Sequence, residues 1–242
     1  AVIRHRLLGA FERTAPAVTL IVAPGGYGKT VLATQFAHAA KGDCLWLRMG
    51  GCSPSERDFP AAVAGKLNPE RSRRLGRANT LPVTVPPDSG WEYLENQISE
   101  LTCHPDVVVL DGFDVLETTR SLVQFISLWQ GVLGGPVKVV CTCRDASTRF
   151  SAQTHDESIW TITGDDLVFD VEQTSELASH VLNREVRWRE AELLNLSSGA
   201  QPALLVLLLR HVMCQSGTIE EALRHRPNDV GDYLRRGFID AL

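Results

Sequence analysis

The chain has 242 residues, of which 44% are hydrophobic and 22% are charged, so its apolar content suffices for a packed core and excludes disorder throughout. Its 24 basic and 29 acidic residues give a formal net charge of −5, which excludes a general basic field for nucleic acid or an anionic membrane. The most apolar run, residues 202–213, contains Arg210 and is shorter than the roughly 20 residues of a membrane-spanning helix. We therefore expect no contact with a membrane. Six cysteines without zinc-ligand spacing are typical of reduced thiols, and they predict a cytoplasmic location.

Strand and helix patterns alternate over roughly the first two thirds of the chain. Apolar runs rich in β-branched residues predict buried strands at 17–23, 44–47, 106–110, 137–141 and 159–162. Amphipathic spacing predicts helices at 30–41, 58–67, 91–101 and 119–133, and the Arg-, Pro- and Ser-rich segment 69–90 predicts a long loop. In the first of these helices Val31, Leu32, Phe36 and Ala39 are expected to form the apolar stripe. This alternation is typical of an α/β fold with a parallel sheet and helices on both faces.

After Phe169 the sequence contains only helical patterns. We expect a helix at 171–182 with Asp170 as its N-cap, followed by helices at 188–196, 202–215, 219–223 and 233–242. The predicted organisation is an α/β domain over 1–166 and an all-helical domain over 167–242. Because the chain begins at Ala1 and ends inside a helical pattern, we expect it to be a fragment of a longer protein.

The most informative segment is Ala-Pro-Gly-Gly-Tyr-Gly-Lys-Thr at residues 23–30, between the first strand and the helix that follows it. Glycines allow successive backbone N–H groups to curl around a phosphate chain, and the start of a helix favours an anion. A lysine and a threonine at the end of such a loop supply an ammonium to the phosphates and a hydroxyl to Mg²⁺. The sequence therefore predicts a phosphate-binding loop, whose nucleotide contacts we expect from Pro24, Gly25, Gly26, Tyr27, Gly28, Lys29, Thr30 and Val31.

Asp111 follows the third predicted strand and fits the carboxylate that holds Mg²⁺ together with Thr30. The alternative is a strand-ending aspartate in a turn with Gly112. Efficient hydrolases usually carry a second acid next to this aspartate, but here that position is Gly112. Asp114 and Glu117 are out of register and are more typical of solvated charges. We therefore predict binding of ATP or ADP with Mg²⁺, and slow turnover at most.

Arg144 closes the segment Val-Val-Cys-Thr-Cys-Arg at 139–144, which continues the fourth predicted strand, and a guanidinium there can reach the terminal phosphate. With Lys29 and Asp111 it completes the candidate catalytic set. The alternative is a surface arginine paired with Asp145. Cys141 and Cys143 alternate with Thr142 along this strand, so both cysteines face one side, and we expect them to pack rather than to bind metal.

With these residues in place, nearly all of the chain resembles the signal-transducing ATPases with numerous domains. Within that class it is most similar to the nucleotide-binding module of MalT-like, LuxR-type transcriptional regulators. The similarity lies in residues 23–30, in Cys-Leu-Trp-Leu at 44–47, in Arg144, in residues 167–170 and in Ser-Gly-Ala-Gln-Pro-Ala at 198–203. The resemblance implies that Arg4 lies near the nucleotide base and that Pro202 touches the adenine. On capping grounds alone, Pro202 also suits the first position of a helix. Ala200 and Gly112 depart from the family's usual glycine and second acid.

The resemblance further implies a regulatory switch, in which ATP binds between the two domains and the ATP state favours self-association. Binding to DNA would then depend on domains beyond Leu242. The first alternative is a stand-alone P-loop ATPase or a kinase-type enzyme, for which the sequence offers neither an acceptor site nor a general base. The second is a nucleic-acid remodeller of the AAA type, against which the acidic balance argues.

Overall fold

The structure is a computed structural model, and it describes residues 2–40, 42–67, 90–101, 104–116, 120–146, 159–215 and 217–224. The predicted loop at 69–90 apart from Gly90, the predicted helix at 233–242, and Glu117 lie outside the described residues.

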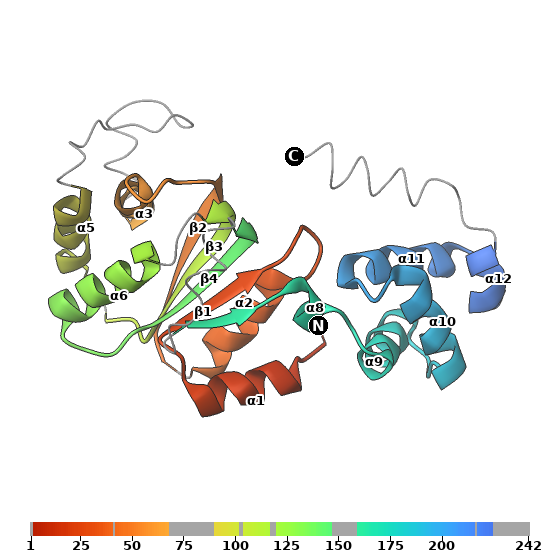
Figure 1. The fold of residues 1–242 in the computed structure, drawn as a ribbon. Coiled ribbons are helices and arrows are strands. Elements are labelled where there is room, and N and C mark those ends of the chain that lie inside the picture. Colours follow the sequence, from red (N-terminus) through yellow and green to blue (C-terminus); the bar gives the residue numbers. More distant parts are fainter. Residues whose placement is uncertain are drawn as a thin grey trace. The chain divides into compact units, whose positions relative to one another are not determined.

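The strands of the described residues join one parallel sheet. The strands are β1 (Val18–Val22), β2 (Cys44–Cys52), β3 (Val107–Leu116), β4 (Lys138–Ala146) and β5 (Ile159–Ile162). Their order across the sheet is β2-β3-β4-β1-β5, with every pairing parallel (Figure 1). The carboxyl ends of the strands therefore lie at one edge of the sheet, which is where ligands bind in open α/β folds.

Helices cover both faces of this sheet, as the sequence predicts (Figure 1). One face carries α1 (His5–Thr14) and α2 (Lys29–Ala39), and the other carries α3 (Phe59–Leu67), α5 (Gly90–Ser99) and α6 (Arg120–Leu133). Phe11 of α1 stacks on Phe36 of α2 with 4.4 Å between ring centroids. The predicted apolar stripe of α2 is wrong at Val31, which is 47% exposed, because Leu32, Ala33 and Phe36 form the buried face instead.

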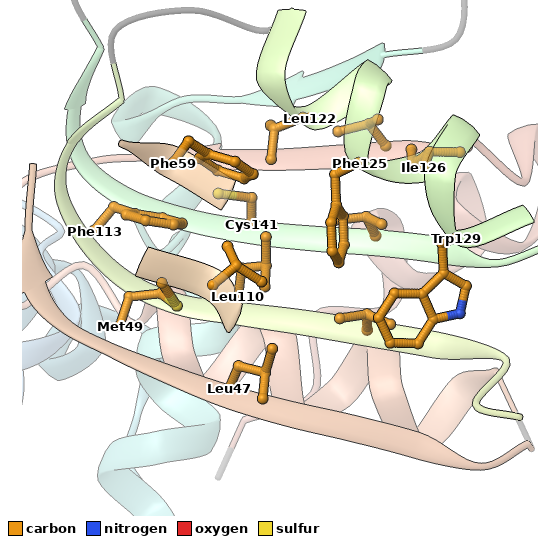
Figure 2. Packing of buried hydrophobic residues seen from close by; sticks show 14 of the residues in the cluster. Leu47, Met49, Phe59, Leu110, Phe113, Leu122, Phe125, Ile126, Trp129 and Cys141 are labelled. Carbon is orange, nitrogen blue, oxygen red and sulfur yellow. The ribbon is translucent and has the colours of Figure 1, made fainter. Parts of the chain in front are cut away.

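The core beneath α3, α5 and α6 follows from the alternation of side chains along each strand. Leu110 and Cys141 point to this side and meet Phe59, Phe113 and Phe125 in the cluster of Figure 2. Burial raises the pKa of the Cys141 thiol well above its ordinary value, so the thiol stays protonated. Cys141 thus packs as a small apolar side chain, in agreement with the expectation from sequence.

Three strands run further than their apolar segments indicate. β2 continues from Leu47 to Cys52. β3 continues through Asp111 to Leu116, and β4 continues through Arg144 to Ala146. The pairing between them is irregular between Leu110 and Phe113. Asp111 therefore lies inside β3 at an irregularity, rather than directly after the strand.

The second part of the described chain is helical, with α8 (Gly164–Leu167), α9 (Val171–Leu182), α10 (Trp188–Ser198), α11 (Pro202–Cys214) and α12 (Ile219–Arg224). Asp170 is the N-cap of α9: its carboxylate accepts the backbone N–H of Gln173 at 2.7 Å. Within the described residues no single helix is long and apolar enough to cross a membrane. The consecutive helices α10 and α11 meet the length and composition criteria only together, across a bend of 119°.

The contacts divide the chain into two compact units. The sheet unit comprises Arg4–Val22 and Thr30–Ile162. Among the described residues, the helical unit comprises those from Thr163 onward, together with Ala23–Lys29 and the two residues that precede Arg4. We call Ala23–Lys29 the glycine-rich loop. By its contacts, this loop belongs to the helical unit.

Candidate functional site

The glycine-rich loop adopts a backbone that requires glycine at two positions. Gly26 has φ 83° and Gly28 has φ 82°, values in the left-handed region that a β-carbon disfavours. The loop follows directly on β1 and leads into α2, which begins at Lys29. Ala23, which stands where such loops usually begin with glycine, is 2% exposed and has an unexceptional backbone. A methyl group is therefore accommodated at this position.

The Lys29 ammonium folds back over the loop. Its Nζ donates to the carbonyl oxygens of Ala23 at 2.6 Å and of Pro24 at 2.9 Å. These bonds hold a positive charge beside the loop's own main chain, where it adds to the positive end of α2. The loop therefore concentrates the charge and the donors that attract an anion.

In the sheet unit, the Thr30 hydroxyl meets the Asp111 carboxylate. Thr30 Oγ1 donates to Asp111 Oδ1 at 3.0 Å and approaches Oδ2 at 3.3 Å, across 81 residues of sequence. The structure thus brings together the two side chains that the sequence predicts as Mg²⁺ ligands.

Thr142 of β4 is a third member of this group that the sequence reasoning missed. Its Oγ1 donates to Asp111 Oδ1 at 2.7 Å and accepts the backbone N–H of Gly112 at 2.8 Å. Thr142 is 1% exposed, so both bonds are sheltered from water. The sequence feature that could have predicted this role is a hydroxyl between Cys141 and Cys143 that faces the opposite side of the fourth predicted strand.

Gly112 is shaped by the irregularity of β3. Its φ is 89°, a conformation that residues with a β-carbon rarely adopt. An acid at this position would have to take the same strained backbone or change it. Position 112 therefore lacks the second carboxylate, and its backbone conformation also favours glycine over an acidic residue.

Arg144 pairs with Asp114, rather than with Asp145 as in the sequence-based alternative. Its Nε lies 3.2 Å from Asp114 Oδ1, and the two side chains are 43% and 36% exposed. An ion pair between side chains with this exposure is worth about 0–1 kcal/mol. Asp114, for which the sequence favoured a solvated charge, is a partner of the proposed phosphate sensor.

Arg4 and Pro202, the two residues assigned to the nucleotide base by resemblance, occupy defined places. Arg4 is 7% exposed, and its backbone N–H donates to Gln35 Oε1 at 3.0 Å. Pro202 is the first residue of α11, where its missing N–H leaves no helical bond unmade.

The glycine-rich loop contacts the start of α11 within the helical unit. The Gln201 side-chain amide donates to the Tyr27 hydroxyl at 3.1 Å, and the Ala203 N–H donates to the Gly26 carbonyl at 3.1 Å. Gln201 is the second residue that the sequence reasoning missed. It follows the turn at 198–200, but no local pattern links it to Tyr27.

The donor set fits a magnesium–nucleotide complex better than a metal held by protein alone. Among the described residues, no three His, Cys, Asp or Glu side chains cluster as metal ligands. Mg²⁺ at nucleotide sites takes only one or two oxygens from the protein and the rest from phosphates and water. Thr30 and Asp111 supply oxygens of this kind.

No protein-family model matches the chain, and no curated protein matches it. Among solved structures it is similar to a Walker-type ATPase of Pyrococcus abyssi, with a TM-score of 0.52, 13% identity, and coverage of 100% of this chain and 75% of that one. It also matches RuvB of Thermotoga maritima, described as a Holliday junction branch migration motor, with a TM-score of 0.42, 14% identity and coverage of 97% and 70%. At 13% identity, the similarity to the Walker-type ATPase establishes the fold alone. That fold is the one the sequence predicts: a P-loop NTPase sheet with helices on both faces, followed by a helical region.

Proposed function

We propose that this chain binds ATP or ADP with Mg²⁺ through the glycine-rich loop, Lys29, Thr30 and Asp111, and that it acts as a nucleotide-dependent switch with slow hydrolysis at most. The observation that carries the proposal is the hydrogen bond of 3.0 Å between the Thr30 hydroxyl and the Asp111 carboxylate. Thr30 directly follows the glycine-rich loop, in which Gly26 and Gly28 have the positive φ angles that a phosphate-binding loop requires. Thr30 and Asp111 are 81 residues apart in the sequence, so their hydrogen bond is not a consequence of local structure.

Each residue has a defined part in binding. The loop's N–H groups donate to the phosphate oxygens, and Lys29 exchanges its carbonyl partners for phosphate. Thr30 and Asp111 hold the metal, and Thr142 holds Asp111. Bound Mg²⁺ supplies charge neutralisation at the terminal phosphates.

Two features favour a switch over a rapid catalyst. Gly112, with φ 89°, stands where a second acid would orient the attacking water. The other acid of β3, Asp114, is engaged by Arg144 at 3.2 Å. Arg144 can exchange this partner for a terminal phosphate, which would make the ion pair sensitive to the difference between ATP and ADP.

The wider role rests on the family resemblance of the sequence. We propose that the chain is the switch module of a multidomain transcriptional regulator of the MalT-like, LuxR type, that its ATP form self-associates, and that DNA is bound by domains outside this chain. Arg4 and Pro202 would then couple the adenine to the helical residues.

The test is a calorimetric titration of the protein and its Lys29→Ala variant with ATP and Mg²⁺. Loss of a charge-assisted contact worth about 1.5–3 kcal/mol weakens binding by roughly 10- to 150-fold. The matched control is Lys66→Ala, which removes an exposed lysine of α3 and leaves the affinity unchanged. Equal affinities of the wild type and a folded Lys29→Ala variant would refute the loop assignment. Steady-state turnover in the usual enzyme range of about 1–10³ s⁻¹ would support the stand-alone ATPase or kinase instead.

A further inference from the structure

Two hydrogen bonds join the glycine-rich loop to residues more than 170 positions later in the chain. The Tyr27 hydroxyl accepts a hydrogen bond from the Gln201 amide at 3.1 Å, although the two residues are 174 positions apart in the sequence. The Gly26 carbonyl accepts the N–H of Ala203 at 3.1 Å. All four residues belong to the helical unit, and the donors lie in and just before the first turn of α11.

The second of these bonds fixes the orientation of a peptide in the loop. A peptide is planar and trans, so its carbonyl and its N–H point in opposite directions. Because the Gly26 carbonyl points toward Ala203, the N–H of Tyr27 points away from α11. An N–H in a loop of this kind is a donor for phosphate. The start of α11 thereby sets the direction of one such donor.

The first bond holds the side chain of the same residue. Gln201 Nε2 fixes the Tyr27 hydroxyl, and the Tyr27 ring packs near Gly164, where an added β-carbon would lie 3.4 Å from Cε1. Tyr27 is therefore restrained at its hydroxyl and along its ring, while its N–H is oriented by the peptide before it. Rotation of the Gly26–Tyr27 peptide would break one bond and pull on the other.

Gln201 itself is supported by a tightly bonded turn. Its N–H donates to the Ser198 carbonyl at 3.1 Å, and the carbonyl of Ala200 accepts the N–H of Phe169 at 2.8 Å. Asn195 Nδ2 donates at 2.8 Å both to the carbonyl of Phe169 and to Thr174 Oγ1. The turn is thus anchored to α9 and α10, so Gln201 presents its amide from a rigid base.

We propose that Gln201 is a positioning residue for phosphate binding, and that it acts through the Tyr27 hydroxyl to hold the glycine-rich loop in its binding conformation. The inference rests on the proposed nucleotide site and deepens it. A loop already held in its bound form loses less entropy when it binds, which raises affinity. By thermodynamic linkage, a nucleotide that tightens the loop also stabilises the bond to α11. The start of α11 therefore favours the binding conformation of the loop, and nucleotide binding in turn strengthens the contact between the loop and α11.

The test is a double-mutant cycle of Tyr27→Phe and Gln201→Met in the full chain, titrated with ATP and Mg²⁺. Tyr27→Phe removes one hydroxyl, and Gln201→Met keeps the side-chain length without the amide. Each single variant should lower the affinity for ATP by about 3- to 10-fold, as expected for one hydrogen bond. The double variant should bind ATP no less tightly than the single variant with the lower affinity. The matched controls Tyr93→Phe in α5 and Gln215→Met after α11 should bind as the wild type does.

A purely structural role is separated by measuring the melting temperature without nucleotide. A fall in melting temperature with unchanged ATP affinity, or losses that multiply in the double variant, would overturn the inference. If the wild type binds ATP and Lys29→Ala does not, while both new variants bind like the wild type, only this inference fails. If the wild type itself binds no nucleotide, the proposed function fails with it.

Discussion

At the scale of single residues, the least expected feature is the threonine that supports Asp111. Thr142 donates to Asp111 and accepts from the Gly112 N–H, and it is 1% exposed. Hydrophobic patterning shows only that Thr142 faces the side of the strand opposite to Cys141 and Cys143. Its partners lie about 30 residues earlier in the chain, at an irregularity in β3 that no local pattern marks.

We expect Thr142→Val to weaken Mg²⁺-dependent ATP binding by about tenfold and to destabilise the fold by about 1–3 kcal/mol, because the Gly112 N–H is left buried without an acceptor. Nucleotide titrations over a range of Mg²⁺ concentrations and urea unfolding measure the two effects. The matched control is Thr19→Val on β1, because the Thr19 hydroxyl is fully buried and has no hydrogen-bond partner among the described residues. That variant should be neutral or more stable, and equal losses in both variants would contradict the assignment.

Ala200 departs from the glycine that the family resemblance implies, and its backbone explains why glycine suits the position. Its φ is 61°, in the left-handed region. We expect Ala200→Gly to raise the free energy of unfolding by about 0.5–1 kcal/mol, because relief of β-carbon strain outweighs the added freedom of the unfolded chain. Thermal unfolding measures the change. Ala178→Gly in the middle of α9 is the control with the opposite expected sign, and a destabilised Ala200→Gly would contradict the argument.

At the scale of elements, the sequence predicts where local chemistry decides the outcome. The bounds of α9 agree with the prediction because Asp170 and Gln173 form a capping box that sequence spacing reveals. β3 and β4 were predicted too short, because their last residues pair with each other irrespective of hydropathy, as Val115 does with Asp145. The order of the strands depends on long-range pairing and was not predicted.

The start of α10 gives a prediction about pH. Glu190 accepts two bonds from Arg184, at 2.8 and 3.1 Å, and one from the N–H of Arg187 at 3.0 Å. The bond from Arg184 is the largest cause that lowers the pKa of Glu190 below its ordinary 4.5. A lowered pKa means that the stabilisation is complete above the unfolded-state pKa and is lost as the pH falls through the folded-state value.

We therefore expect Glu190→Gln to lower the free energy of unfolding by about 0.5–1 kcal/mol at pH 7, since the side chains remain partly in water. The difference from wild type should disappear as the pH falls below 4.5, and it should shrink at high salt. Urea unfolding at several pH values measures it. Glu192→Gln, on the same helix but outside this group of bonds, is the control. A loss that persists at acid pH would show that charge is not its cause.

At the scale of the whole molecule, the fold class was predictable because alternating strand and helix patterns leave few arrangements of a parallel sheet. The glycine-rich loop was predictable because its residues are consecutive. Gln201 was not, because its bond to Tyr27 spans 174 residues. The expected division into 1–166 and 167–242 stays a prediction.

The proposed switch makes a prediction about assembly. We expect light scattering to give a larger mass with a non-hydrolysable ATP analogue and Mg²⁺ than with ADP, because the terminal phosphate draws Arg144 from Asp114 and selects a second state. Lys29→Ala should keep the smaller mass under both conditions. Equal masses of the wild type with both nucleotides would contradict nucleotide-dependent self-association.

The path of the chain between its units has a practical consequence for dissecting the protein. The backbone passes from one unit to the other after residues 3, 22, 29 and 162, so the loop of seven residues is a short excursion within the first part of the sequence. Cutting the gene at residue 167 would strand Gly26 and Tyr27 in one polypeptide and their donors, Ala203 and Gln201, in the other. Under the proposed function, neither product would contain the complete phosphate-binding loop together with the residues that orient it. Co-expression of the two pieces, rather than either alone, is the form in which a split version should recover nucleotide retention.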